Sequence, residues 1–478
     1  MLLAGDLWSL QSGLLALALL GEVLAVVFVY RVLTRGGSAA STLLWMLLIL
    51  AAPWFGLLAY YLLPRRLQLR RLRRLRERGD RLREVQGGGP DDAPQAPRPG
   101  DLEQLLDLHG GLTEGNDVRW LPSGARFFEA AAEQIRQATR HVHCVVYILR
   151  PDETGLRFLE LLADAAARGV QVRLCYDSFG SWGLKARHLE ALRAAGGRAE
   201  AFLPLLWKRR PFTLNLRNHR KLLVVDGEVA YVGGRNIADE YRHDRIGKRR
   251  RWLDAMVELR GPVVDELQQV FVQDWCTATD EVLADTFRAA PPSVGACRVG
   301  VVVSGPDQEQ PALWFALAQA VTEARHELTL SSPYLVLPET LLFLLGLASA
   351  RGVRVRVYTN GRSTEAFLLY HAQRQRYRRL LEAGVELYET GEAYNHAKLL
   401  VVDGRTVVVG SANMDLRSAH LNFEIATVAL EAPRLAEDVC ATLEERGADC
   451  ARVRPEDLPR MPLARLLDGV CGLFAPLL

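Results

Sequence analysis

Residues 218–236 read NHRKLLVVDGEVAYVGGRN, and residues 395–413 repeat them as NHAKLLVVDGRTVVVGSAN. Both copies have one spacing: His-x-Lys, four residues, Asp, six residues, Gly followed by Gly or Ser, one residue, Asn. The repeat singles out His219, Lys221, Asp226, Gly233, Gly234 and Asn236 in the first copy and His396, Lys398, Asp403, Gly410, Ser411 and Asn413 in the second. A motif that occurs twice at one spacing indicates a duplicated unit.

Each copy is predicted to form a β-hairpin. An apolar run (222–225 or 399–402) is followed by Asp-Gly and then by a second apolar run (229–232 or 407–409), which is the pattern of two strands joined by a tight turn. His and Lys stand two residues apart and therefore point to the same face of a strand. The glycines let the backbone approach a ligand closely, and the Asn adds an amide. One copy thus supplies an imidazole, a fixed positive charge and polar donors, which suit a phosphate oxygen.

A structural hairpin with a satisfied core histidine is the alternative, because short motifs give many false matches. The distribution of lysine argues against it. The chain is rich in arginine, and its only lysines are Lys185, Lys208, Lys221, Lys248 and Lys398. Two of the five occupy equivalent motif positions, where a compact ammonium has not been replaced by guanidinium. The repeat is therefore interpreted as functional.

The two copies resemble the paired HKD motifs of the phospholipase D superfamily. The flanking sequences NLRNHRK, GGRNIADEY, RWLDAMVELRGPVV, FVQDW and SANMDLRS leading to NFE are similar to those of bacterial cardiolipin synthases. The resemblance implies an α/β fold of two phospholipase D-like α/β/α sandwich domains in a pseudo-twofold arrangement, with the motifs meeting at the interface. It also implies that the downstream carboxylates Asp254 and Glu424 orient the two imidazoles.

The same resemblance implies the reaction. In that family one phosphatidylglycerol loses glycerol, and the head-group hydroxyl of another takes the phosphatidyl group to give cardiolipin through a covalent phosphatidyl-histidine. By resemblance His219 is the nucleophile, and His396 is the acid and then the base. Such chemistry needs one neutral and one protonated imidazole. The non-bridging oxygens would be held by Lys221, Lys398, Asn236 and Asn413. No cofactor or metal is expected, because no cluster of carboxylates resembling a metal site lies near the motifs.

Asp226 and Asp403 are counted with the catalytic set by family practice. Their place at the turn, just beyond the first strand, favours a second role in which they lock the loop by hydrogen bonds or ion pairs. The sequence leaves open how the turn aspartates and the downstream carboxylates divide the work.

The first 64 residues are predicted to form a transmembrane hairpin with helices at about 12–32 and 42–63. Residues 14–30 are apolar apart from Glu22, and residues 42–63 carry no charge, so each stretch can span roughly 30 Å of hydrocarbon as a helix. A cleaved signal peptide is the alternative for the first, but no basic region precedes it. For Glu22 an inter-helix hydrogen bond or a shallow position is favoured over a functional site.

An Arg-rich juxtamembrane segment and linker follow at residues 65–100. Its arginines are Arg65, Arg66, Arg70, Arg71, Arg73, Arg74, Arg76, Arg78, Arg81 and Arg83. By the positive-inside rule this cluster places that end of the hairpin in the cytoplasm, and it would also contact anionic head groups. The sequence therefore predicts a multi-pass protein of the cytoplasmic (inner) membrane, with its catalytic domains on the cytoplasmic side.

The remaining residues are predicted to form two domains, 101–290 and 291–478, each containing one motif. A strand, helix, strand series at 142–148, 155–167 and 170–176 returns at 327–332, 341–350 and 353–359. A chain of 478 residues is long enough for two or three domains with cores of their own. The final stretch, 463–478, is expected to pack as a helix rather than contact the membrane, because it is too short to span.

The expected partners are phosphatidylglycerol and an anionic phospholipid membrane. Basic patches at 208–210 and 242–251 could guide head groups, with a solvated face as the alternative. They are not interleaved with aromatic residues, so no nucleic acid is expected.

Seven scattered cysteines argue against a disulfide framework or a zinc site. The competing activities are a membrane-anchored phospholipase D and a phosphatidylserine synthase-like transferase; a scaffold without activity would be expected to carry a damaged motif. Donor, acceptor and oligomeric state stay open.

Overall fold

The computed structural model describes residues 19–31, 33–34, 39–56, 101–204, 216–246, 250–283, 291–308, 310–447, 449–459 and 461–473. Its contacts divide the chain into an N-terminal unit, Met1–Arg74, and a larger unit, Leu75–Leu478. Each unit is described by itself. The predicted arginine cluster at 65–83, the linker and the basic patch at 208–210 lie outside the described residues.

The N-terminal unit contains a helix over residues 19–31 and helix α2 (Ala39–Ala51). Ala25 and Phe28 of the first helix and Ile49 of α2 form its small buried cluster. None of the described helices combines the length and the apolar character that a membrane crossing requires. The predicted helices at 12–32 and 42–63 extend beyond the described residues, so the transmembrane hairpin stays a prediction. Glu22 is exposed.

The larger unit is built on one sixteen-stranded sheet that contains the same strand order twice. In the first lobe, residues 101–283, the order is β4-β3-β2-β6-β7-β10-β1, and in the second lobe, residues 291–473, it is β15-β14-β12-β17-β18-β20-β11. The two lobes join where β1 pairs antiparallel with β11. Strand β21 extends the outer edge of the second lobe. The repeated order is the duplication that the two motifs predict.

The strands of the first lobe are β1 (Thr113–Leu121), β2 (His141–Val146), β3 (Gln171–Asp177), β4 (Arg198–Phe202), β5 (Arg217–Asn218), β6 (Leu222–Val225), β7 (Val229–Gly233), β8 (Arg245–Ile246), β9 (Arg250–Leu253) and β10 (Met256–Arg260). The strands of the second lobe are β11 (Cys297–Ser304), β12 (Glu327–Ser331), β13 (Leu335–Val336), β14 (Arg354–Asn360), β15 (Glu386–Thr390), β16 (Tyr394–Asn395), β17 (Leu399–Val402), β18 (Thr406–Gly410), β19 (Met414–Asp415), β20 (Asn422–Leu430) and β21 (Cys450–Val453).

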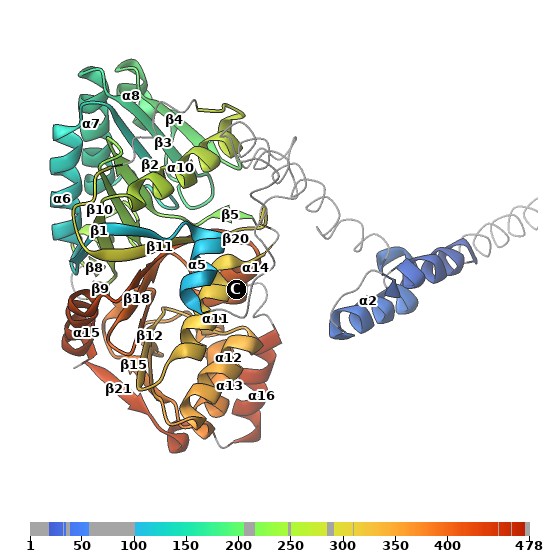
Figure 1. Ribbon diagram of the computed structural model, residues 1–478. Helices are drawn as coiled ribbons and strands as arrows, with labels where there is room; N and C mark the ends of the chain where they lie inside the picture. Colours follow the sequence, from blue (N-terminus) through green and yellow to red (C-terminus); the bar gives the residue numbers. More distant parts are fainter. Residues whose placement is uncertain are drawn as a thin grey trace, which may run out of the picture. The chain divides into compact units, whose positions relative to one another are not determined.

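Helices cover both faces of each lobe (Figure 1). In the first lobe α6, α7 and α8 lie on one face and α10 on the other; in the second, α11, α12 and α13 lie on one face and α15 on the other. The helices are α5 (Leu102–Gly110), α6 (Gly124–Gln137), α7 (Glu153–Ala167), α8 (Glu190–Ala194), α9 (Asp239–Arg242), α10 (Val263–Thr279), α11 (Ala312–Glu323), α12 (Glu339–Ala350), α13 (Phe367–Glu382), α14 (Leu416–His420), α15 (Pro433–Gly447) and α16 (Pro462–Leu473), with 3-10 turns at Ala186–Leu189 and Pro455–Asp457. This is the α/β/α layering predicted for two related units.

The two lobes exchange packing elements. Helix α5 precedes the first lobe in the chain, yet Leu102 and Leu106 belong to the core of the second lobe. Helix α15 reaches back to β1, where the Trp120 indole N–H donates to the Thr442 hydroxyl at 2.9 Å. Burial of a leucine side chain such as Leu102 or Leu106 contributes roughly 1.5–3 kcal/mol to the stability of the fold. The two halves are therefore joined by core packing as well as by the sheet.

The elements predicted from periodicity are confirmed. The strand expected at 142–148 is β2, the helix at 155–167 is α7, and the strand at 170–176 is β3; β12, α12 and β14 repeat them in the second lobe. Helix α7 begins where the Asp152 carboxylate accepts the main-chain N–H of Gly155 at 3.0 Å, a typical N-cap. The helix predicted at 463–478 is described over Pro462–Leu473 as α16, and one of its faces lies against α13.

Each motif hairpin turns at its Asp-Gly pair with positive φ, 54° and 70° at Asp226 and Gly227 and 50° and 60° at Asp403 and Gly404. The Asp226 carboxylate accepts the main-chain N–H groups of Thr139, Arg140 and His141, each at 2.8 Å. Asp403 accepts three successive N–H groups at 325–327 in the same way, at 2.8–2.9 Å. The turn aspartates therefore fasten each hairpin to the beginning of the neighbouring strand.

We expect Asp226→Ala to lower the free energy of unfolding at pH 7 by about 2 kcal/mol, since charged acceptors contribute more than neutral ones. Burial raises the pKa of Asp226, but the N–H groups of Thr139, His141 and Arg140 outweigh it and lower that pKa from 3.8. A lowered pKa gives stability above the unfolded value that is lost as pH falls through the folded value. The denaturant midpoint of Asp226→Ala should therefore approach that of wild type as the pH is lowered from 7 to ~3.

The exposed neighbour on the same turn, Glu228, supplies the control. Glu228→Ala should leave the free energy of unfolding at pH 7 within about 0.5 kcal/mol of wild type. An equal loss in both variants would mean that the turn, and not the carboxylate, carries the stability.

Candidate active site

Both motif histidines line one pocket of about 320 Å³ at the boundary of the lobes. The pocket lies beyond the carboxyl ends of β2 and β12, the central parallel strands of each lobe. Its walls are Tyr147, Ile148, Arg150, Arg217, His219, Asn236, Glu240, Tyr241, Trp252, Tyr334, Tyr394, His396, Asn413, Asp415, Arg417 and Asn422. The predicted meeting of the two copies is thus present in the structure.

A short strand carries each histidine across to the opposite lobe. Strand β5, just before His219, pairs with β20 of the second lobe, and the His219 N–H donates to the Phe423 carbonyl at 2.9 Å. Strand β16, just before His396, pairs with β9 of the first lobe, and the His396 N–H donates to the Leu253 carbonyl at 2.6 Å. Each imidazole is therefore positioned by the main chain of both lobes.

The histidines take their carboxylate partners from the opposite lobe. His219 Nδ1 lies 3.0 Å from both carboxylate oxygens of Glu424, and His396 Nδ1 lies 2.7 Å from Asp254 Oδ2. Both carboxyl groups are fully buried, which alone would raise their pKa, but the pKa of Glu424 is lowered by His219 and Lys221 and that of Asp254 by His396 and Lys398. An ionised carboxylate only accepts, so each Nδ1 must carry the proton, and Nε2 keeps the lone pair.

The sequence difference between Gly-Gly and Gly-Ser is explained by how each carboxylate is held. A Cβ at Gly234 would lie 2.1 Å from Asp254 Oδ1, so only glycine fits there. At the equivalent position the Ser411 hydroxyl donates to Glu424 Oε2 at 2.5 Å. A Cβ at Gly233 or Gly410 would meet the adjacent strand at 2.3 Å and 2.6 Å. The glycines were predicted to let the backbone approach a ligand, which stays a prediction; in the structure they also seat strands and a carboxylate.

The motif lysines are buried and bonded to their own motif. Lys221 Nζ donates to the His219 carbonyl at 2.6 Å, and Lys398 Nζ donates to the His396 carbonyl and lies 3.0 Å from His396 Nδ1. Burial lowers the pKa of Lys221 well below its usual value and lowers that of Lys398 to about 8, while the nearby carboxylates oppose this. A ligand phosphate would have to draw these ammonium groups away from carbonyls or act on them through space.

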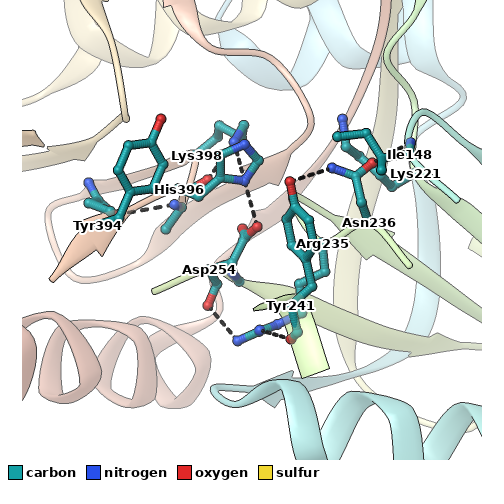
Figure 2. Close-up of polar contacts among 12 residues, drawn as sticks. Ile148, Lys221, Arg235, Asn236, Tyr241, Asp254, Tyr394, His396 and Lys398 are labelled. Atoms are coloured by element: carbon teal, nitrogen blue, oxygen red, sulfur yellow. Dashed lines mark hydrogen bonds and ion pairs between the residues drawn. The ribbon is translucent and has the colours of Figure 1, made fainter. Parts of the chain in front are cut away.

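The two asparagines differ. Asn236 Oδ1 accepts the Ile148 N–H at 3.0 Å, and its amide donates to the Tyr241 hydroxyl at 2.9 Å. Asn413 Oδ1 is buried and has no hydrogen-bond partner among the described residues. Figure 2 shows the series of polar contacts that links the two sides of the site, through His396, Asp254, Arg235, Tyr241, Asn236 and Ile148.

Both imidazoles are poised as neutral bases by their surroundings in the protein. Burial lowers the pKa of His219 to about 4, with Lys221 adding to the effect and Glu424 opposing it. Burial and Lys398 lower the pKa of His396 to about 3. At neutral pH neither ring carries a net charge. The proton needed for acid catalysis therefore has to be taken up when the ligand binds.

Asp226 and Asp403 lie away from the pocket. The four-residue strand β6 separates Asp226 from Lys221, a distance of roughly 16 Å along the strand. Their bonds to the main chain support the locking role weighed from the sequence.

Sequence reasoning missed much of the pocket wall. Aromatic rings pack on both histidines, with Tyr147 4.8 Å from His219 and Trp252 5.2 Å from His396 between centroids. Arg217 and Arg417 also line the pocket, whereas Arg242 of the predicted basic patch lines a separate cavity. Burial raises the pKa of Asp415 to about 6. The nearness of Arg217 and Arg417 to the motifs was the available signal.

Among the residues that the structure describes, no group of three or more His, Cys, Asp and Glu side chains is arranged to hold a metal ion. The expectation of a reaction without metal stays a prediction.

The sequence profile described as cardiolipin synthase, PLD-like domain, matches residues 132–275 and 317–446. The chain belongs to the cardiolipin synthase family. A cardiolipin synthase of a Geobacillus species is 32% identical over 100% of this chain and 96% of its own, and that of Geobacillus thermodenitrificans is 35% identical over 88% and 86%. Family membership makes the protein an enzyme, a phosphatidyltransferase of the phospholipase D superfamily.

Two further comparisons concern the fold and the N-terminal unit. The crystal structure of phosphatidylserine synthase from Haemophilus influenzae superposes with a TM-score of 0.58 at 15% identity, covering 79% of this chain and 98% of that one. This likeness shows a shared fold for the larger unit. A profile described as phospholipase D-nuclease N-terminal matches residues 23–63.

We expect Glu424→Gln to lower kcat about a hundredfold or more, because an amide no longer fixes the Nδ1–H tautomer of His219. Glu258→Gln is the matched control: Glu258 is a buried glutamate on β10, the strand equivalent to β20, and it bonds to Tyr231 and Arg119 outside the pocket. Steady-state rates should separate the two variants. Similar rates for both would show that the carboxylate crossing between lobes is not needed for turnover.

Proposed function

We propose that the protein makes cardiolipin from two molecules of phosphatidylglycerol through a phosphatidyl-His219 intermediate. The observation that carries this proposal is the crossed pairing of His219 with Glu424 and of His396 with Asp254 on one pocket. It provides two neutral imidazoles whose Nε2 atoms are both available for proton and phosphoryl transfer.

In the first step the Nε2 lone pair of His219 attacks phosphorus of the donor. The bond between phosphorus and the head-group oxygen breaks, His396 gives that oxygen a proton, and glycerol leaves. The imidazole of the covalent intermediate is cationic, and the buried Glu424 carboxylate 3.0 Å away stabilises it.

In the second step the head-group hydroxyl of another phosphatidylglycerol attacks phosphorus. Its proton passes to His396, now a neutral base, and the bond between phosphorus and Nε2 breaks. Cardiolipin is released, and His219 is neutral again. The order of the two histidines rests on resemblance to the superfamily.

Binding of the anionic substrate favours the protonated form of His396 that the first step requires. A phosphodiester charge in a buried pocket favours the imidazolium form, so its arrival raises the pKa of a neighbouring histidine. Arg217 and Arg417 in the pocket wall would attract the same anion. Lys221, Lys398 and the two motif asparagines, Asn236 and Asn413, are proposed to stabilise the transferring phosphoryl group, and Asp226 and Asp403 to act as positioning residues.

We further propose that the N-terminal unit anchors the enzyme in the cytoplasmic membrane as a multi-pass protein, with the larger unit on the cytoplasmic side. The exposed apolar side chains of its described helices, among them Val23, Val26, Leu43 and Leu47, support contact with hydrocarbon. The match of residues 23–63 to an N-terminal profile of phospholipase D-like proteins supports the same view.

The deciding experiment uses full-length protein in phosphatidylglycerol vesicles without added metal or nucleotide. Lipid products and free glycerol are followed by mass spectrometry. We expect cardiolipin and glycerol in equal amounts, with both lost in His219→Ala and in His396→Ala. Phosphatidic acid without cardiolipin would identify a hydrolase instead, and lipid on His396 rather than His219 in acid-quenched protein would reverse the roles.

The lowered pKa values lead to a separate prediction. The pKa is about 3 for His396 and about 4 for His219, so both rings are neutral at pH 7. Binding of a phosphodiester should therefore be accompanied by uptake of about one proton. Calorimetry in buffers of different ionisation enthalpy measures this number with a non-reacting phosphonate analogue. Uptake should vanish in His396→Ala. Binding without proton uptake in wild type would mean that His396 is not the acid.

A further inference from the structure

Both lobes carry exposed apolar side chains on segments that are packed against the pocket wall. In the first lobe they are Phe179 and Trp182, in the segment after β3, and Trp182 is 76% exposed. In the second lobe they are Phe367 at the beginning of α13 and Leu463, Leu466 and Val470 of α16; Leu463 is 73% and Leu466 61% exposed. We call these six side chains the rim surface.

The first-lobe part of the rim is fastened directly to the pocket wall. The Ser181 hydroxyl donates to the carbonyl of Tyr147 at 3.1 Å, and the Phe179 ring lies 5.4 Å from the Arg217 guanidinium carbon. Tyr147 and Arg217 both line the pocket. Trp182 therefore projects outward from a segment whose neighbours form the wall.

The second-lobe part reaches the pocket through α16. One face of α16 is packed: the Asp468 carboxylate bonds to His371 Nδ1 of α13 at 2.6 Å, and Cys471 is buried in a cluster with Leu416 packed on it. Leu416 stands between the pocket residues Asp415 and Arg417. Figure 1 shows α16 along the outer side of α13. Its leucines on the opposite face are left without protein to cover them among the described residues.

Each part lies at the carboxyl ends of the parallel strands of its own lobe. The segment with Trp182 follows β3, and α13 follows β14, the equivalent strand of the other lobe. Both strands run parallel to the central strands whose carboxyl ends lead into the pocket. The rim surface therefore surrounds the entrance from both lobes.

The exposed charged side chains in the segment around Trp182 and on α16 are basic. Residues 178–188 contain no acidic residue, and Lys185 and Arg187 are exposed there. Helix α16 carries Arg465 exposed, while its one acidic side chain, Asp468, is buried against His371. Apolar side chains with a Trp and adjacent cations are the composition that binds an anionic lipid interface.

We propose that the rim surface seats the larger unit on an anionic phospholipid bilayer, with the pocket mouth facing the lipid. This inference rests on the proposed function, since it requires a lipid substrate whose acyl chains stay in hydrocarbon while its phosphorus reaches His219. A second copy of the chain on the same surface would close the pocket mouth to lipid.

The test compares bilayer with monomeric substrate in the full-length protein. Trp182→Ser combined with Leu466→Ser should raise the apparent KM for phosphatidylglycerol vesicles about tenfold. The rate on monomeric dihexanoyl-phosphatidylglycerol should stay within about twofold of wild type, which also shows that the variant is folded. The matched control is Val294→Ser: Val294 is 54% exposed but lies beside Gly115, near the beginning of β1, at the opposite end of the sheet from the pocket.

An unchanged vesicle KM, or an equal loss on both substrates, would overturn the proposal. A dimer in detergent that becomes a monomer in the double variant, with the vesicle KM unchanged, would assign the surface to a second copy instead. Failure of the proposed function has a different signature, because wild type would then make no cardiolipin from either substrate.

A readout independent of turnover uses vesicles with brominated acyl chains. The emission that disappears on Trp182→Phe should be quenched by bromine, because an inserted indole lies next to the chains. Unquenched difference emission would place Trp182 in water and reject the rim surface as a lipid contact.

Discussion

Two histidine–carboxylate pairs that cross between the lobes are the interaction on which the site depends. Neither lobe contains a complete catalytic unit: each supplies the imidazole of one pair and the carboxylate of the other. A buried carboxylate without a partner is costly, so loss of either imidazole would leave an uncompensated charge in low dielectric. The geometry of the active site therefore depends on the association of the two lobes.

The rest of the fold can be understood as support for this crossing. The short strands β5 and β16 leave their own lobe to pair with β20 and β9, which brings each histidine to the partner carboxylate. Arg220, between the first His and Lys, bonds to the Glu424 carbonyl and to Asp274 of α10. Arg235, after the first Gly pair, bonds to the Asp254 carbonyl. Buried guanidinium groups thus fix the main chain on which the carboxylates stand.

Burial also sets the chemistry of the site. The low pKa of each imidazole and of each motif lysine has one main cause, removal of charge from water; neighbouring ammonium groups add to it at both histidines, and the ionised carboxylates only partly offset it. Such a pocket holds little net charge on its histidines until an anion enters. Preorganised donors in such a buried pocket stabilise the charge that develops on a transferring phosphoryl group.

Local pattern in the sequence determined the hairpins, the α/β series and its duplication, because alternation, turn residues and helical periodicity are properties of neighbours in the chain. The lysines and asparagines were found in the same way, as positions of a repeated motif. The aromatic wall was not found, since Tyr147 and Trp252 carry no pattern that separates them from core residues. The packing role of Gly234 was not found because the group that excludes a side chain there, Asp254, lies twenty positions away in a different element.

The sequence by itself therefore determined the motif residues and that they come in two related sets. Only the tertiary structure decided which histidine meets which carboxylate, because that choice depends on strand pairing between residues about 140 and 205 positions apart. The same holds for the exposed face of α16: its amphipathic pattern is local, but the face left uncovered was decided by packing against α13. Contacts of this range depend on where the whole chain places two segments, and no local spacing encodes that.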